Sequence, residues 1–183
     1  MNNIRFIMRT VDNDNLQEYI DKIPNIEFAR DRIHNAMDTF KLSLEMAGDD
    51  ACVHLEDDII LCNNFVTKIN LEIAKRPNEV IQFFSMRKDD LIIGSRYVNG
   101  RDFCGNLCVY LPPHMGTAIL KYMDIWDGYE KNPTAYDYLM ADYFKANKIK
   151  YWNVCPNLVD HKIQKSRINP KRSSKRVSLT FEK

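Results

Sequence analysis

Three consecutive acidic residues, Glu56-Asp57-Asp58, directly follow the apolar segment 51–55. Because side chains alternate along a strand, we expect Glu56 and Asp58 on one side and Asp57 on the other. Burying such close like charges costs on the order of several kcal/mol unless a cation or hydrogen-bond donors neutralise them. Oxygen ligands of this kind favour Mg²⁺ or Mn²⁺. The alternative is an exposed acidic turn before a helix N-terminus.

Two further candidates lie later in the chain. His161 ends the segment Pro156-Asn157-Leu158-Val159-Asp160-His161, soon after a strand-like segment, so its imidazole is a candidate metal ligand beside the carboxylates. Asp137 lies near the start of a predicted helix, in an aromatic-rich stretch. The alternatives are a surface or hydrogen-bonded histidine and an ordinary acid at a helix N-terminus.

Basic residues are concentrated at the C-terminus. Residues 162–183 contain eight Lys/Arg and one acid, a charge of +7, which leaves 18 Lys/Arg and 24 acids, or −6, for residues 1–161. This division suits a metal site closed by cations over a phosphate-bearing ligand, or a tail that contacts nucleic acid or another anionic surface. A solvated tail is the alternative. We expect residues 1–161 to form one domain and 162–183 to close on the site of that phosphate-bearing ligand.

Length and composition fit one compact domain with its own core. The five cysteines are odd in number and scattered, which indicates reduced thiols rather than a disulfide framework. No segment approaches the roughly 20 apolar residues of a membrane span, and the N-terminus enters a strand-like run directly. We therefore expect a cytoplasmic protein.

Hydrophobic periodicity predicts alternating strands and helices. Strands are expected at 4–8, 26–29, 51–55, 80–84, 107–111 and 151–154, and helices at 13–21, 33–47, 65–73, 112–122 and 135–146. Residues 91–98 with the turn signal Asn99-Gly100 suggest a hairpin. The alternation predicts an α/β fold with a mixed, mainly parallel sheet flanked by helices, and a functional site at the carboxyl ends of the strands.

An apolar strand ending in Glu-Asp-Asp, a preceding helix with Arg32 and Asn35, and a late Pro-Asn-Leu-Val-Asp-His with a nearby Ser-Arg together resemble the GT-A glycosyltransferases. The resemblance covers most of the chain and implies a nucleotide-diphospho-sugar transferase-like fold. It implies that Asp58 binds Mn²⁺ or Mg²⁺, that Glu56 contacts the metal or the ribose, and that His161 is a late metal ligand. The chain departs from the family's DxD motif by having Glu in place of the first Asp.

The same resemblance implies roles for further residues. Asp137 corresponds to the acid that takes the acceptor's proton in inverting members, or that orients the acceptor in retaining ones. Arg9 and Thr10 correspond to the place that holds the nucleotide base, and Arg32 and Asn35 to the group beside the diphosphate. The remaining residues expected at the nucleotide-sugar donor are Asp57, Ser166, Arg167 and Arg172.

The sequence is also similar in style to small phage-encoded transferases, some of which glycosylate modified DNA bases. A phage-encoded chain would act in the host cytoplasm, on a glycan or on modified nucleic acid. Two other functions stay open. A metal-dependent nuclease or phosphotransferase would need more acids than Asp137 and Asp142 offer for a second metal, and the chain has no Gly-rich Walker loop. An inactive nucleotide-sugar-binding module would keep the same fold.

Overall fold

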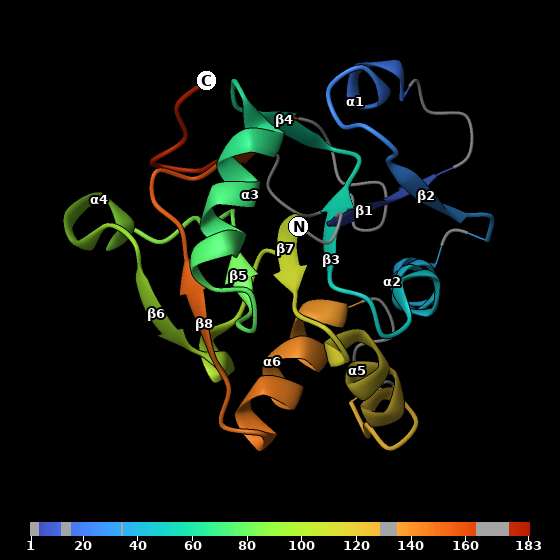
Figure 1. Cartoon of the computed structure of the whole chain (residues 1–183). Helices are drawn as coiled ribbons and strands as arrows, with labels where there is room; N and C mark the ends of the chain where they lie inside the picture. Colours follow the sequence, from blue (N-terminus) through green and yellow to red (C-terminus); the bar gives the residue numbers. More distant parts are fainter. Residues whose placement is uncertain (1–3, 12–15, 34, 129–134, 164–175) are drawn as a thin grey trace.

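A computed structural model describes residues 4–11, 16–33, 35–128, 135–163 and 176–183. Seven strands form one sheet in the order β2-β1-β3-β7-β5-β8-β6 (Figure 1). Strands β1, β2, β3, β5 and β8 run in one direction, and β7 and β6 run in the other. The strands are β1 (Arg5–Val11), β2 (Glu27–Asp31), β3 (Cys52–Glu56), β5 (Ile81–Gln82), β6 (Arg96–Asn99), β7 (Cys108–Leu111) and β8 (Lys150–Asn153).

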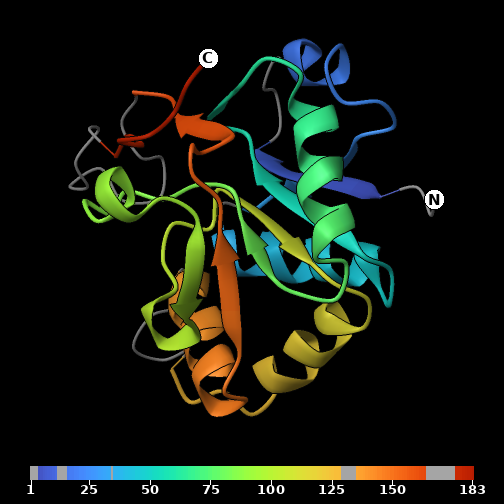
Figure 2. The same cartoon turned by 60° about the vertical axis from the view of Figure 1, so that its left-hand side comes forward.

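Helices cover both faces of the sheet (Figures 1 and 2). One face packs against α1 (Gln17–Ile20) and α3 (Phe65–Lys75), and the other against α2 (Ala36–Ala47), α5 (Met115–Met123) and α6 (Tyr136–Ala146). Strand β1 serves both layers because its side chains alternate: Phe6 and Met8 join one core cluster, and Ile7 joins another. The predicted α/β class, with a mixed, mainly parallel sheet flanked by helices, is confirmed.

Local signals in the sequence set the ends of α2. Asn35 is the N-cap, and its side chain accepts hydrogen bonds from the backbone N–H groups of Met37 and Asp38. Gly48 follows the last turn with a φ of 58°, a conformation that glycine adopts without steric cost. Ile33, predicted to lie within this helix, precedes it and is 70% exposed.

A two-stranded ribbon lies beside the main sheet. Strand β4 (Ile59–Leu61) pairs antiparallel with β9 (Val159–His161), so that Ile59 is opposite His161. The C-terminal residues run next to this ribbon (Figure 2). Neither short strand was predicted, and together they bring the end of the chain to the end of β3.

The predicted hairpin at residues 91–98 is wrong. Residues Asp90–Ile93 form the short helix α4, and Arg96–Asn99 form β6, which pairs with β8. Asp90 is buried and forms an ion pair with Arg96 at 2.6 Å, whereas the apolar side chains of α4 are exposed. Residues 91–93 are consecutive apolar residues, as in a buried strand, but they lie exposed on a short helix. The apolar pattern alone therefore predicted the wrong element.

The other predicted elements are present, with shifted ends. The strand predicted at 80–84 is the two-residue β5, and the helix predicted at 13–21 is the short α1. Thr134, the predicted cap of α6, lies outside the described residues. None of the described helices combines the length and apolar character needed to cross a membrane.

Candidate functional site

The three consecutive acids lie at the carboxyl edge of the sheet. Glu56 is the last residue of β3, and the neighbouring parallel strand β1 ends at Val11. Strand β7 runs in the opposite direction, so the loop before it reaches the same edge, where the Glu56 N–H donates to the Leu107 carbonyl oxygen at 2.9 Å. This edge is where α/β proteins commonly bind ligands.

Asp57 is held by the end of β1. The Thr10 hydroxyl donates to Asp57 Oδ2 at 2.7 Å, and the Val11 N–H points to the same oxygen at 3.3 Å. The Tyr19 hydroxyl contacts the carbonyl oxygens of Asp57 and Ile59 at 2.6 and 2.8 Å. These contacts hold the turn between β3 and β4. We call residues 56–58 of this turn the acidic turn, and Thr10 supports it.

Glu56 is partly buried, against Arg9 and Tyr136. Arg9 Nη2 is 3.3 Å from Glu56 Oε1, and the Tyr136 hydroxyl donates to the same oxygen. Burial raises the pKa of Glu56 to about 8, and the Asp58 carboxylate adds to the rise, whereas Arg9 and the Tyr136 hydrogen bond oppose it. Glu56 therefore holds a proton more readily than a solvent-exposed glutamate does.

The Arg9 guanidinium is buried within the protein and 5% exposed. It lies 5.3 Å from the ring centroid of Phe40 and 4.8 Å from that of Tyr136, and its Nη2 donates to the Asn106 carbonyl oxygen at 2.6 Å. Two other nitrogens of Arg9, Nε and Nη1, have no hydrogen-bond partner. The contacts of Arg9 join the acidic turn to α2, α6 and the loop before β7.

Asp137 belongs to the same network. It lies in the first turn of α6, and its Oδ1 accepts a hydrogen bond from the Asn106 backbone N–H at 3.1 Å. Its charge is among the causes that raise the pKa of Glu56. Asn106 therefore binds Arg9 through its carbonyl oxygen and Asp137 through its N–H, which connects the acidic turn to the predicted acceptor-side carboxylate.

Asp58 meets His161. Asp58 Oδ2 lies 3.0 Å from His161 Nε2, and the imidazole is 1% exposed. The β4–β9 register places these residues together, and the Lys162 N–H donates to the Asp58 carbonyl oxygen at 2.7 Å. The two predicted metal ligands, which are distant in sequence, are thus adjacent.

The chemistry of this pair fits a divalent cation that arrives with a ligand. Asp58 Oδ1 is buried without a hydrogen-bond partner, beside the Oδ2 that faces His161 Nε2. Two ligands on adjacent octahedral positions, each about 2.1 Å from the metal, lie about 3 Å apart. Among the residues that the structure describes, no group of three or more His, Cys, Asp or Glu is arranged to hold a metal. Phosphate oxygens and water would therefore have to complete the coordination, as is common for Mg²⁺.

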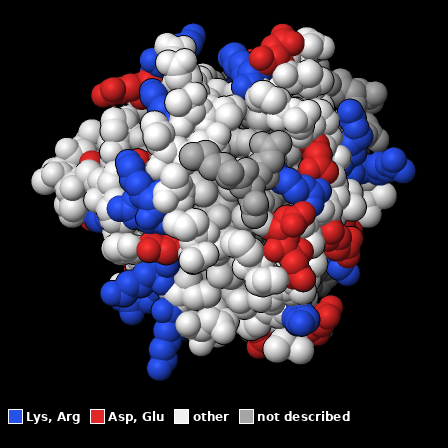
Figure 3. Space-filling view, viewed as in Figure 1, with Lys and Arg blue, Asp and Glu red and all other residues white. Residues whose placement is uncertain are grey.

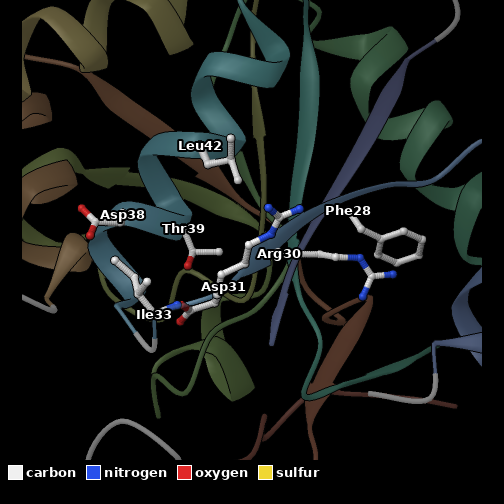
Figure 4. A pocket seen from close by; sticks show the side chains of 8 residues that line it. Phe28, Arg30, Asp31, Ile33, Asp38, Thr39 and Leu42 are labelled. Atoms are coloured by element: carbon white, nitrogen blue, oxygen red, sulfur yellow. The ribbon is translucent and has the colours of Figure 1, made fainter. Parts of the chain in front are cut away.

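Arg32 and Asn35, the residues predicted beside the diphosphate, lie in a different setting. Arg32 lines a pocket of about 470 Å³ between the edge strand β2 and α2, and Asn35 uses its side chain to cap α2. In this pocket the Arg30 guanidinium lies alongside the Phe28 ring, 5.6 Å from its centroid (Figure 4). Arg32 therefore belongs to this pocket, and Asn35 to the start of α2.

The predicted cations of the tail, Arg167 and Arg172, and the neighbouring Ser166 lie outside the described residues. Among the described basic residues of this segment, Arg176 contacts the predicted metal ligand: its Nη2 is 2.8 Å from His161 Nε2. The sequence offered no signal to distinguish Arg176 from the other basic residues of the tail.

Two other residues of the site also went unpredicted. Tyr136 is adjacent to Asp137 in the aromatic-rich stretch. A phenol next to a candidate site residue could have been predicted to donate a hydrogen bond to one of the carboxylates of the site, as it does to Glu56. Asn106 follows Gly105, which has a φ of 73° and marks a turn before β7. That turn signal could have placed Asn106 at the sheet edge, but its role depends on backbone groups that any residue carries.

No family profile matches the sequence, and no curated protein matches it. Among solved structures, A197 from STIV has a TM-score of 0.51 and 15% identity, with 98% of this chain and 96% of that chain covered. A Bacillus anthracis protein assigned as a glucose-1-phosphate thymidylyltransferase, solved with sucrose, has a TM-score of 0.48 and 10% identity, with 84% and 69% covered. The chain is thus similar in fold to A197 over nearly its whole length.

Proposed function

We propose that this chain is a metal-dependent glycosyltransferase, which moves a sugar from a nucleotide-sugar donor to an acceptor hydroxyl on a glycan or a modified nucleic acid. The proposal rests on one observation: Asp58 Oδ2 lies 3.0 Å from His161 Nε2, and the other carboxylate oxygen, Asp58 Oδ1, is buried without a hydrogen-bond partner. The pair lies at the sheet edge where the acidic turn and Asp137 also converge.

Asp58 and His161 would hold a Mn²⁺ or Mg²⁺ ion. Such an ion supplies positive charge that binds the donor diphosphate and stabilises it as a leaving group. Asp57 keeps the turn in place through Thr10 and Val11, so that the Asp58 carboxylate faces His161. Rigid support of this kind places a ligand before the substrate arrives.

Asp137 would act on the acceptor. The Asn106 N–H donates to Asp137 Oδ1 and so orients the carboxylate, which would take a proton from an acceptor hydroxyl or orient that hydroxyl. The network from Asp137 through Asn106 and Arg9 to Glu56 joins the acceptor side to the donor side. Groups on rigid elements at fixed separation favour transfer between two bound substrates.

Isothermal titration calorimetry of nucleoside diphosphates with Mn²⁺ or with EDTA tests the donor site. We expect binding only with Mn²⁺, because the acidic turn otherwise repels phosphate. Asp58→Asn keeps the size of the side chain and removes its charge, and should weaken metal-dependent binding by at least about tenfold. The control is Asp89→Asn, which makes the same change at an exposed position in front of α4 and should bind as the parent does.

Equal binding in EDTA would show that the diphosphate does not depend on a cation. Unchanged affinity in Asp58→Asn would mean that the acidic turn is a structural strand end. Either result would overturn the proposal.

A further inference from the structure

The last eight residues, 176–183, form a C-terminal strap that is anchored to the β4–β9 region. The Ser178 N–H donates to Asp160 Oδ1 at 2.6 Å. The Asn157 N–H donates to Thr180 Oγ1 at 3.2 Å, and the Ser178 hydroxyl donates to Asn157 Oδ1 at 2.7 Å. Phe181 packs against the core cluster on the α3 side of the sheet. The strap therefore belongs to the folded domain, and it delivers Arg176 to His161.

His161 Nε2 has two neighbours, one of which requires a hydrogen on this nitrogen and the other a lone pair. Asp58 Oδ2 lies 3.0 Å from this nitrogen and Arg176 Nη2 lies 2.8 Å from it. A ring nitrogen carries either a hydrogen or a lone pair in the ring plane. With a hydrogen it can donate to Asp58 but meets the Arg176 N–H, and with a lone pair it can accept from Arg176 but faces the carboxylate. Neither tautomer satisfies both contacts.

A divalent cation removes this conflict because it accepts electron pairs from the imidazole and the carboxylate together. The guanidinium of Arg176 brings a positive charge to the same imidazole nitrogen, 2.8 Å from His161 Nε2. His161 is 1% exposed, so a charged group beside it is shielded from water, and the charge is felt strongly.

We propose that Arg176 and a divalent cation are alternative occupants of the position at His161 Nε2, so that the metal enters only as Arg176 leaves. The inference rests on the proposed function, since it concerns the same metal site. A single residue, Val177, separates Arg176 from the anchor at Ser178. The side chain can therefore swing away while the strap stays docked, and its guanidinium remains close enough to bind an incoming phosphate group.

Mn²⁺ titration without nucleotide, followed by the electron paramagnetic resonance signal of the free ion, tests this exchange. Arg176→Gln removes the competing cation, and Mn²⁺ should bind about tenfold tighter, the equivalent of one charge-assisted hydrogen bond. Lys162→Gln is the matched control, because Lys162 is adjacent to His161 in sequence but contacts Glu18 and the Tyr19 ring. It makes the same charge change and should shift Mn²⁺ affinity less than about twofold. Arg176→Met is a second variant that keeps the apolar stem.

The same titration repeated with nucleoside diphosphate separates this inference from the proposed function. If the parent binds Mn²⁺ and nucleotide together, but neither Arg176 variant binds Mn²⁺ more tightly, only the exchange is overturned. Equal tightening in Lys162→Gln would also overturn it, because a general field effect would then suffice. If the Arg176 variants bind Mn²⁺ more tightly and no protein binds nucleotide, the exchange stands and the proposed function fails.

Discussion

Each of the three acids at the end of β3 has its own partner: Arg9 and Tyr136 for Glu56, Thr10 for Asp57, and His161 for Asp58. Like charges in adjacent positions are tolerated because each carboxylate faces different donors. The unusual residue types at a strand end were readable from the sequence, and so was the late histidine. The supporting groups were not, because Asn106 acts through its backbone and Tyr136 through a contact between distant elements.

We expect the stability of the protein at low pH to depend on His54, in the middle of β3. Its ring is fully buried, and the Ser43 hydroxyl donates to the Phe40 carbonyl oxygen, so His54 Nδ1 can only donate to Ser43 Oγ, at 3.2 Å. Burial lowers the pKa of His54 to about 3, with smaller contributions from Arg9 and Arg5. The folded protein therefore keeps the imidazole neutral.

Because the folded pKa lies below the unfolded one, the contribution of neutral His54 is complete above about pH 6.5 and is lost as the pH falls toward 3. Urea unfolding at several pH values should show it. His54→Leu removes this proton linkage, so the stability of the parent relative to the variant should fall by about 1.4 kcal/mol for each pH unit below about 6.

His114→Gln is the control, because it removes a histidine from an exposed position and leaves the buried His54 in place. If the curves of parent and His54→Leu stay parallel from pH 7 to 4, the buried ring does not resist protonation.

Among the elements, the ribbon and the strap bring residues to the site that the long strands do not carry. Strands β1 and β3 present the acidic turn, but the β4–β9 register supplies His161, and the strap supplies Arg176. A truncation after Asp160 would test whether the C-terminal segment is dispensable for folding. It would also remove Phe181 from the core and the hydrogen bonds to Asn157. Point substitutions are therefore the cleaner test.

Phe181→Ala should lower the free energy of unfolding by about 1–2 kcal/mol, less than for a fully buried Phe, because the ring is partly buried. Leu179→Ala, at a neighbouring position that is 43% exposed, should cost less than about 0.5 kcal/mol. Chemical denaturation of both variants measures the difference. Equal small effects would contradict docking of the strap.

Strong periodicity made most elements predictable. The spacing of Phe65, Ile69 and Ile73 gave α3, and all three side chains are buried. The misassigned residues 91–93 show the limit of this approach, because an exposed apolar run looks like a buried strand when its partners are unknown. The three-residue strands β4 and β9 were missed since their pairing joins segments far apart in sequence, for which local pattern carries no signal.

In the whole molecule, the site combines residues distant in sequence, from the carboxyl edge of the seven-stranded sheet and from the two-stranded ribbon beside it. The sequence divides into an acidic body and a basic end, but acidic and basic side chains are interspersed on the face seen in Figure 3. The described basic residue of greatest consequence is Arg176, which turns inward to His161. One charge of the basic segment therefore lies at the candidate site.

The central claim is that the site breaks the bond between a sugar and a nucleoside diphosphate. The most direct test is to incubate the protein with Mn²⁺ and a panel of nucleotide-sugars, and to separate the nucleotide products by ion-exchange chromatography. We predict release of nucleoside diphosphate, with the sugar transferred to an acceptor or to water. Release should depend on metal and fall roughly a thousandfold in Asp58→Asn, equivalent to about 4 kcal/mol of transition-state stabilisation. Release of nucleoside monophosphate and sugar phosphate would contradict the claim, because the phosphate–phosphate bond would then be the one that breaks.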